Sequence, residues 1–476
     1  MAISVIEQKP KGNTQVVGQE IIFVVSNDTA VADQLRVKFG VEVRISNETI
    51  PNTAVSDDLI GTFKVTPNNA GVAIFDFRSV VENYVKADNM AANGSTYKGT
   101  TTEDTTPHPL HIIDKYSRND NSVRYMVLTF FVEYLGADAL LPNAVSRADG
   151  TDVNSDGIRI FNGYLKYTDP LVIEAGTSNF GFDFTPLNLT GSTKSLLTNA
   201  PTNQYANIND YGTVAMLNPM IFQDDALDEI THFTLIYYPE TGAALDTEEV
   251  DITELNGAYD VFDIHADNII LYFGCFPGNL QNWSVKFQNL VAAGTIQGGR
   301  IALSARNSAN TVKSSVYNIY INCPDTKNFD PIRLCWLNQW GAWDYYTFNK
   351  KSIQTISTQG STYQQLQGTW NQSRYRVDSY KGGKKAFRVN ATESITINTD
   401  FLSEDENVMF EEMINSPEIY ELTGYKTDVA QSALNDYVIP VRMKSTSFTK
   451  KTIANDRLIQ YTFQIEKSKT LRTQSV

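Results

Sequence analysis

Hydrophobic and polar residues alternate along several stretches of this chain, and that period of two predicts β-strands. In residues 35–45, apolar side chains occupy every second position, and charged residues or glycine fill most of the positions between them. The same alternation recurs in residues 317–321 and 459–466. Successive side chains of a strand point to opposite faces, so each segment is expected to bury one face and expose the other.

Continuous apolar runs predict further strands that are buried on both faces. Such runs occupy residues 21–25 and 125–135, and residues 233–239 and 268–273 are also predicted to be strands. Residues 63–67 and 73–75 flank the sequence Asn68-Asn-Ala-Gly71, whose residues are typical of turns, so the sequence predicts a hairpin there.

The clearest helix is predicted over residues 403–415, and a short helix that Asp76 or Ser79 would cap is predicted over Val80, Val81 and Tyr84. Ser403 and Glu406 have the spacing of a capping box, in which the serine and the glutamate each satisfy a free backbone amide at the helix start. Apolar residues follow at helical spacing, and the Ser416-Pro417 pair predicts the end of the helix.

Polar, glycine-rich segments predict two long loops, at residues 88–110 and 136–157. Between such loops, short strands recur with turn signals, as in β-sandwiches. The expected fold is therefore mainly β and multi-domain, with several β-sandwich (Ig-like) modules and a few short helices. The expected modules are 1–165, 166–325, and a C-terminal module 326–476 that contains the helix near 403–415. We also expect the two loops to reach adjacent subunits, because loops this long are usually functional or disordered.

Composition narrows the classes of protein. The 476 residues carry a net charge of −15, which disfavours a protein that wraps duplex nucleic acid. Three widely spaced cysteines, at positions 275, 323 and 335, predict neither a disulfide framework nor a zinc site. The sequence has no apolar run long enough for a signal peptide or a membrane span, so we expect synthesis in the cytoplasm and no membrane span.

Candidate chemistry is sparse. Residues 152–157 match the start of a calcium-binding loop, with Asp152, Asn154 and Asp156 as the potential ligands. The twelfth position of that loop is Gly163 rather than the glutamate that completes such a site, which favours a polar surface turn.

No other motif supplies a reactive group. The histidines, at positions 108, 111, 232 and 265, do not form a metal-binding pattern, and Cys335 between two large apolar residues predicts a buried structural thiol. Nucleophile and phosphate-binding motifs are absent from the sequence. We therefore predict no catalytic, cofactor-binding or metal residue and no enzyme activity, although the 54 acidic residues leave a paired-carboxylate hydrolase as an alternative.

Charge is unevenly distributed near the C-terminus. Residues 400–436 contain ten acidic residues and one lysine, whereas residues 442–476 contain eight basic and two acidic residues. The two segments are interpreted either as separate solvated faces or as an electrostatically matched contact between neighbouring subunits.

The densest signal is an aromatic block in residues 333–348. It contains three of the five tryptophans, and its structural or interface candidates are Trp336, Trp340, Trp343, Tyr345, Tyr346 and Phe348. Asp344 is the only carboxylate within it. Aromatic residues at this density suit a packed contact surface, and the alternative is a groove in which an exposed ring stacks on a sugar.

Four segments together resemble a known protein family. They are the N-terminal residues 23–39 with 67–76; the segment Phe273-Gly-Cys-Phe-Pro-Gly-Asn-Leu280; the block from Arg333 through Phe348; and residues 398–417 with Ile439-Pro-Val441 and the closing strand. In this order they resemble tail and ring structural proteins of tailed bacteriophages that infect Bacteroidetes-type hosts, including crAss-like phages. Where that family has Trp-Leu-Asn-x-x-Gly-Gly, this chain has Trp336-Leu-Asn-Gln-Trp-Gly-Ala342.

The resemblance implies a structural virion protein without a cofactor. It implies a subunit of a homo-oligomeric ring in the phage tail, as a tail ring, hub or adaptor, that forms part of the DNA-delivery conduit. The implied partners are other tail and portal-proximal proteins, with passing contact to DNA in the lumen, and the implied location is the virion after synthesis in the host cytoplasm. The alternative is a receptor- or glycan-binding tail or baseplate protein, which would expose at least one tryptophan of the block.

Overall fold

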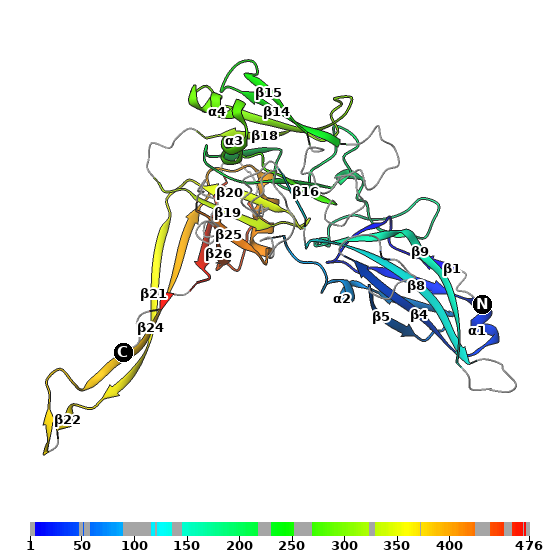
Figure 1. The fold of residues 1–476 in the computed structure, drawn as a ribbon, viewed down its shortest axis with the longest axis horizontal. Coiled ribbons are helices and arrows are strands. Elements are labelled where there is room, and N and C mark those ends of the chain that lie inside the picture. The colour runs from blue at the N-terminus through cyan, green and yellow to red at the C-terminus, as the bar shows by residue number, and fades with distance from the viewer. Residues whose placement is uncertain are drawn as a thin grey trace, which may run out of the picture. The chain divides into compact units, whose positions relative to one another are not determined.

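In the computed structural model the chain is mainly β, with several separate sheets and a few short helices, as the sequence predicts (Figure 1). The structure describes residues 5–46, 51, 58–88, 116–119, 121–135, 145–217, 230–251, 269–322, 329–371, 373–423, 438–451, 459–469 and 471–472. Most of the predicted loop 88–110 lies outside these residues.

The chain divides into two compact units. Unit 1 comprises Met1–Cys323 together with Leu337–Tyr345, and unit 2 comprises Pro324–Trp336 together with Tyr346–Val476. The boundaries expected after residues 165 and 325 stay predictions.

The N-terminal part of unit 1 is a sandwich of two sheets whose strands are mostly antiparallel. The first has the order β1-β3-β6, and the second has the order β2-β9-β8-β4-β5. The strands are β1 (Val5–Gln8), β2 (Thr14–Val16), β3 (Ile22–Ser26), β4 (Leu35–Ser46), β5 (Leu59–Val65), β6 (Val72–Asp76), β8 (Val123–Leu135) and β9 (Val145–Phe161), with the helices α1 (Asp28–Asp33) and α2 (Arg78–Val81).

One hydrophobic core lies between these two sheets. Phe23 of β3 packs against Phe130 of β8, with ring centroids 5.9 Å apart, and Phe75 of β6 lies 5.7 Å from the same ring. The alternating residues of β4 join this core, because Phe39, Val41 and Val43 are fully buried. The period of two in residues 35–45 therefore corresponds to a real buried face.

Two local predictions in this sandwich were wrong. Strands β5 and β6 do not form a hairpin, because β5 pairs with β4 in one sheet and β6 pairs with β3 in the other. The loop predicted over residues 136–157 was also wrong in part, because residues 145–157 belong to β9, which pairs with the buried strand β8. A short pattern identifies a strand but not its partner, and pairing with a buried neighbour overrides weak local propensity.

The rest of unit 1 contains two further principal sheets. One has the order β12-β18-β17-β14-β15, and the other has the order β13-β16-β7. The elements are β7 (Tyr116–Arg118), β10 (Leu171–Ile173), β11 (Phe180–Phe182), η1 (Thr185–Leu187), β12 (Asn203–Ala206), β13 (Val214–Leu217), β14 (Ile230–Tyr238), β15 (Asp246–Asp251), β16 (Ile270–Phe273), α3 (Pro277–Trp283), α4 (Val285–Ala292), β17 (Arg300–Asn307) and β18 (Tyr317–Ile321).

Aromatic contacts join these elements. Phe233 of β14 stacks on Phe273 of β16 with ring centroids 4.6 Å apart, so the two sheets share a core. On the same strand, Tyr237 contacts Phe287 of α4 at 5.5 Å. The predicted strands at 233–239, 268–273 and 317–321 are confirmed, and Tyr317, Ile319 and Ile321 share a buried face.

Unit 2 is built on a sheet with the strand order β20-β19-β25-β26-β27-β24-β21, in which β28 also pairs with β24. The elements are β19 (Ile332–Leu337), β20 (Trp343–Phe348), β21 (Ile353–Gln365), β22 (Gly368–Asn371), β23 (Arg374–Val377), β24 (Gly383–Asn398), η4 (Glu404–Glu406), α5 (Asn407–Asn415), β25 (Ile419–Leu422), β26 (Val438–Met443), β27 (Thr462–Lys467) and β28 (Leu471–Arg472). Strands β19 and β20 each have residues in both units.

The helix predicted over residues 403–415 is confirmed as η4 followed by α5. The Glu406 carboxylate accepts a hydrogen bond from the Ser403 backbone N–H at 2.8 Å, which completes the capping box. Helix α5 ends at Asn415, directly before Ser416-Pro417. None of the described helices has both the length and the apolar character that crossing a membrane requires.

The sandwich core provides the first testable prediction. Replacement of Phe130, which is 1% exposed, by alanine should lower the local free energy of unfolding by about 3–5 kcal/mol, because it leaves a cavity among Phe23, Phe75 and β4. The matched control is Phe63→Ala on the edge strand of the same sandwich, where the ring is 39% exposed. Native-state hydrogen exchange of β4 and β8 measures both effects, and equal losses would contradict the assigned core.

Candidate functional site

The aromatic block forms a hairpin in which β19 leads into β20 through a tight turn at residues 338–342. The Asn338 side-chain oxygen accepts hydrogen bonds from the backbone N–H groups of Trp340 and Ala342, each at 3.0 Å. Gly341 adopts a φ of 72°, and an added Cβ there would lie 1.9 Å from the Asn162 carbonyl oxygen. Glycine is therefore required at position 341, whereas a side chain is accommodated at Ala342.

The tip of this hairpin is buried within unit 1. Trp340 is 6% exposed, and its indole N–H donates to the Asn199 side-chain oxygen at 3.2 Å. Its ring lies 5.6 Å from that of Phe182. The neighbouring Gln339 accepts a hydrogen bond from the Asn199 side-chain N–H at 2.9 Å, so one asparagine holds two consecutive residues of the turn.

The following residues are equally buried. The Trp343 indole N–H donates to the Asp88 carbonyl oxygen at 3.0 Å. The Asp344 carboxylate accepts a hydrogen bond from the Thr198 hydroxyl at 2.5 Å, and the Tyr345 hydroxyl lies 3.0 Å from that of Thr213. The polar groups of these residues therefore form hydrogen bonds that fix the hairpin within unit 1.

The base of the hairpin belongs to the core of unit 2. Phe410 of α5 lies at the centre of an aromatic cluster, with ring centroids 6.4 Å from Trp336, 5.0 Å from Tyr346 and 6.3 Å from Phe348. Trp336 is fully buried, Phe348 is 1% exposed and Tyr346 is partly buried. The Tyr346 hydroxyl accepts a hydrogen bond from the Asp400 backbone N–H at 3.2 Å, and burial raises its pKa.

All six candidate residues thus lie in one hairpin, but none forms an open groove. The predicted burial of Cys335 is confirmed, and burial raises the pKa of both the Cys275 and the Cys335 thiols well above the ordinary range. Neither thiol is a nucleophile at neutral pH, because nucleophilic attack requires the thiolate.

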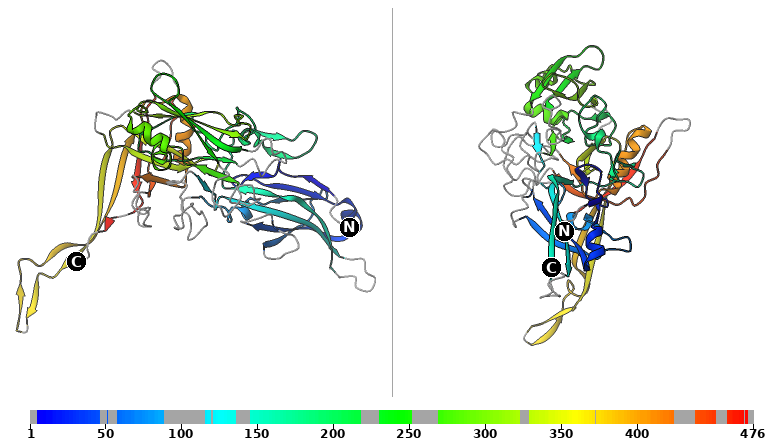
Figure 2. Two further views of the ribbon diagram at one scale, coloured as in Figure 1. Left: turned by 45° about the horizontal axis from the view of Figure 1, so that its top comes forward. Right: turned by 90° about the vertical axis from the view of Figure 1, so that its right-hand side faces the viewer.

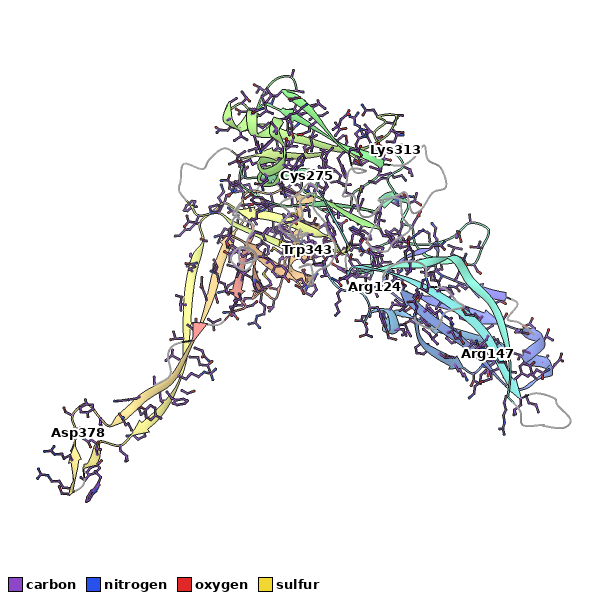
Figure 3. The ribbon with its side chains drawn as sticks, viewed as in Figure 1. Arg124, Arg147, Cys275, Lys313, Trp343 and Asp378 are labelled. Atoms are coloured by element: carbon purple, nitrogen blue, oxygen red, sulfur yellow. The ribbon has the colours of Figure 1, made fainter. Side chains whose placement is uncertain are left out.

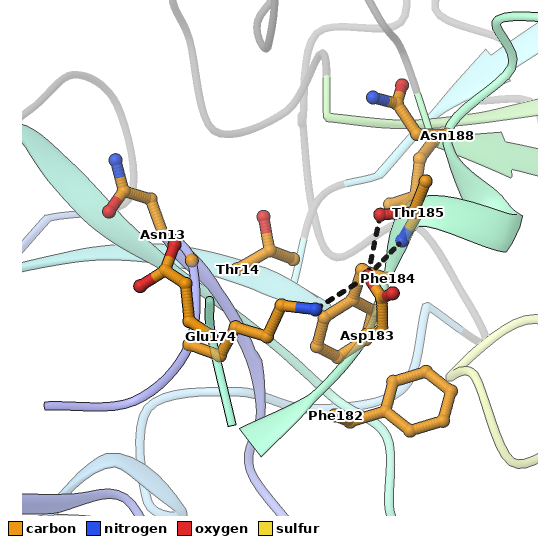
Figure 4. A pocket seen from close by; sticks show the side chains of 11 residues that line it. Asn13, Thr14, Glu174, Phe182, Asp183, Phe184, Thr185 and Asn188 are labelled. Carbon is orange, nitrogen blue, oxygen red and sulfur yellow. Dashed lines mark hydrogen bonds and ion pairs between the residues drawn. The ribbon is translucent and has the colours of Figure 1, made fainter. Parts of the chain in front are cut away.

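A surface cavity of about 200 Å³ lies elsewhere in unit 1. It is lined by Lys11, Gly12, Asn13, Thr14, Glu174, Phe182, Asp183, Phe184, Thr185, Asn188 and Leu217. The Asp183 carboxylate lies 3.2 Å from the Lys11 ammonium and accepts a hydrogen bond from the Thr185 hydroxyl at 2.6 Å. Figure 4 shows Asp183 beside Thr185.

The two acids of this cavity have the same protonation state. The hydrogen bonds from Thr185, together with Lys11, lower the pKa of Asp183. A hydrogen bond from the Asn179 side chain, at 2.7 Å, is the main cause that lowers the pKa of Glu174. A glycosidase needs one carboxyl group with a raised pKa as its general acid, and this cavity offers none among its lining residues.

The candidate calcium segment lies in a bulge of β9. Met126 pairs with Ile158 whereas Leu128 pairs with Val153, so residues 154–157 lie opposite Val127 alone. Asp152 pairs with Thr129 within the ladder, and Gly157 has a φ of 67°. The side chains of Asp152, Asn154 and Asp156 are not among those that the structure describes. Within the described ranges, no group of three or more metal-ligating side chains is placed to hold an ion.

The other residues singled out from the sequence are dispersed. His232 lies on β14, and its Nδ1 is 3.0 Å from the Thr231 hydroxyl; the other three histidines and Cys323 lie outside the described residues. The acidic and basic C-terminal segments are partly paired within the chain. Lys450 of the basic segment contacts Glu411 of the acidic segment at 2.6 Å. Arg442 contacts Glu466 at 2.8 Å, within the basic segment itself.

A feature that sequence reasoning missed is a long hairpin of β21 and β24, which run side by side beyond the sheet of unit 2 (Figures 1 and 2). We call residues 357–392 of this hairpin the arm. Strand β24 pairs with β27 and β28 only between Asn390 and Asn398, so the outer part of β24 has β21 as its sole described neighbour. The arm also contains the β22–β23 hairpin.

The arm exposes large apolar side chains along its length, and Figure 3 shows side chains projecting from it up to the labelled Asp378. Six such residues are largely exposed: Leu366 (77%), Trp370 (66%), Tyr375 (49%), Val377 (65%), Tyr380 (72%) and Phe387 (55%). The sequence of β21, rich in Thr, Ser and Gln, has no apolar face that would have predicted it. Gly382 and Gly383 adopt positive φ at the start of β24.

No protein-family model matches the sequence, and no curated protein matches it at a significant level.

The two most different tryptophans of the chain provide a second prediction. Trp336→Ala should lower the free energy of opening of β19 and α5 by about 3–5 kcal/mol, because a fully buried indole is removed from the Phe410 cluster. Trp370→Ala, at a position 66% exposed, should change it by less than about 0.5 kcal/mol. Hydrogen exchange of both variants makes the comparison, and similar values would mean that Trp336 is accessible.

The turn provides a third prediction. Gly341→Ala should destabilise the hairpin by at least about 3 kcal/mol, because the new Cβ meets the Asn162 carbonyl and the φ of 72° is strained for alanine. Gly176→Ala is the control, since its φ is 79° but no atom lies within 4 Å of an added Cβ. Its expected cost is only about 1–2 kcal/mol. Thermal unfolding that ranks the two variants equally would contradict the close approach at Asn162.

Proposed function

We propose that this chain is a structural subunit of a multi-subunit assembly, a ring in the tail of a tailed bacteriophage. The observation that carries the assembly role is the arm. A two-stranded hairpin is marginally stable in water, and six large apolar side chains exposed on it form a surface suited to contact with another macromolecule. A subunit of a larger particle provides such a partner.

The aromatic block supports a structural role in a different way. A sugar-binding protein would present at least one of its tryptophans in a groove. Trp336, Trp340 and Trp343 are instead 0%, 6% and 2% exposed, and each packs within its own unit. Their burial favours the structural reading of the block over the glycan-binding one.

The position within the phage is supported by the sequence resemblance alone. It favours a homo-oligomeric tail ring, hub or adaptor that forms part of the DNA-delivery conduit and contacts tail and portal-proximal proteins. The modules are proposed to be Ig-like sandwiches, and the protein is proposed to be a virion component made in the host cytoplasm. The proposed role needs no catalysis and no cofactor.

A receptor- or glycan-binding tail protein is the second candidate, and one observation favours it. Trp370 lies directly opposite Tyr375 in the β22–β23 ladder, and both rings are largely exposed. Such a pair can stack on a sugar ring. In this case Trp370→Ala would abolish binding to a glycan array while leaving assembly of the protein unchanged.

The fourth prediction tests the proposed function. The purified full-length chain is expected to form closed rings in negative-stain images, and mass spectrometry of gradient-purified phage particles should find the chain in a stoichiometric amount. A ring is expected because a subunit that projects one contact surface and receives another repeats around an axis. Absence of the chain from purified particles would overturn the virion role whatever its behaviour in solution.

A further inference from the structure

The arm is strongly basic, although the chain as a whole is acidic. Its residues include six lysines or arginines and one aspartate, a net charge of +5. Since the whole chain carries −15, the rest of the chain carries −20. The arm therefore has the opposite sign to the remainder of every copy of this protein.

Three of these cations have no role within the described fold. In the part of the chain that the structure describes, the side chains of Arg374, Arg376 and Lys384 make no hydrogen bond or ion pair. By contrast, Lys381 contacts Asp378, and Lys385 donates to the Tyr380 carbonyl oxygen at 3.0 Å. Arg374 and Arg376 lie on β23 beside the exposed Tyr375 and Val377, and Lys384 is exposed near the start of β24.

We propose that the arm docks on the acidic surface of a second copy of this chain, in a head-to-tail contact. The inference rests on the proposed assembly function and specifies how the subunits are joined. Charge complementarity favours a second copy as the partner, because the rest of the chain, with a net charge of −20, attracts a segment with a net charge of +5. The exposed apolar residues supply the area to be buried.

The same charges limit the geometry of the contact. Two arms cannot pair with each other favourably, because each carries +5. The arm must therefore contact a different surface of its neighbour. A reciprocal exchange of arms in a two-fold dimer would meet this condition as well, but the proposed ring requires the heterologous, head-to-tail arrangement. Heterologous contacts close into rings or propagate as filaments, whereas isologous contacts end at a dimer.

Nucleic acid is the other polyanion that a basic, aromatic hairpin attracts. The exposed Leu366 and Val377 side chains gain nothing from phosphates, and the −20 on the rest of the chain repels them. The observations therefore favour the acidic surface of a second copy, and DNA binding becomes an outcome of the test.

The fifth prediction is tested with two variants that change only the arm. In the first, residues 360–389 are replaced by Asn-Gly, which closes a tight hairpin between the register partners Gln359 and Asn390. The pairing of β24 with β27 and β28 is retained. In the second, Arg374→Glu, Arg376→Glu and Lys384→Glu change the charge of the arm from +5 to −1.

The matched control reverses three exposed cations elsewhere, with Lys38→Glu, Arg78→Glu and Lys469→Glu. It changes the net charge of the chain by the same amount as the arm reversal. Mass photometry against protein concentration should show that both arm variants weaken association at least about tenfold, while the control remains close to wild type. Circular dichroism and hydrogen exchange of β19 and β25 should be unchanged in all variants, which separates lost contact from lost folding.

A mixing experiment tests the head-to-tail geometry. The truncated chain lacks the arm but keeps the acidic surface, so small amounts added to wild type should open rings into arcs. Carbodiimide coupling of mixed ¹⁴N- and ¹⁵N-labelled chains should join Lys384 to acidic residues of the other isotope.

Each failure has a distinct meaning. Assembly of the truncated chain at the wild-type level, or equal damage by the control, would overturn the arm contact while leaving a ring of other design. A wild-type chain that stays monomeric at every concentration would also overturn it, whereas the virion role is judged by particle composition. If the chain binds a DNA duplex through the arm while assembly is unaffected by the arm variants, the partner of the arm is nucleic acid and not a second copy.

Discussion

The close approach of Gly341 to the Asn162 carbonyl is the constraint on which the central hairpin depends. It allows the turn at residues 338–342 to sit where Asn338, Gln339 and Trp340 each find a polar partner. The hairpin then places Trp343 and Tyr345 in unit 1 and Trp336 and Phe348 in unit 2. A block of aromatic residues fixed at both ends by burial has no ring left for a ligand.

This use of the aromatic block redirects the search for function toward the surface. Buried indoles stabilise the fold through packing, and the indole N–H groups of Trp340 and Trp343 donate to a side-chain amide oxygen and a backbone oxygen. The exposed aromatic residues of the arm have no such partners in the core, and they lie where contact with another molecule is geometrically possible. The distinction between the two sets rests on exposure and not on residue type, since Trp336 and Trp370 are chemically identical.

Much of the fold was predictable because burial on one face leaves a period of two in the sequence. Residues 35–45 show this, and so do Tyr461, Phe463 and Ile465 in the closing segment. The partner of each strand was not predictable, because the turn at residues 68–71 has the same chemistry whether the flanking strands pair or lie in different sheets. Strand β9 was missed for a related reason: its polar residues pair with β8, whose own apolar side chains supply the burial.

The candidate site was predictable in its residues but not in its role. Aromatic density indicates burial or binding equally well, and only the exposed fraction of each side chain separates the two. The arm was less predictable still, because β21 has exposed positions on both faces and therefore carries no amphipathic signal. Its basic character was visible in the sequence only as a local run of lysines and arginines.

The arm also has the internal order that a docking element requires. Tyr363 and Phe387 pack across the two strands at 6.4 Å, and Trp370 faces Tyr375 in the ladder of the tip. Asp378 pairs with Lys381 across the adjoining turn at 3.6 Å. These contacts order the hairpin in the unbound chain. Binding therefore costs less conformational entropy than it would for a flexible segment. Because the contacts leave Arg374, Arg376 and Lys384 at the surface, the order of the arm and its charge serve the same interface.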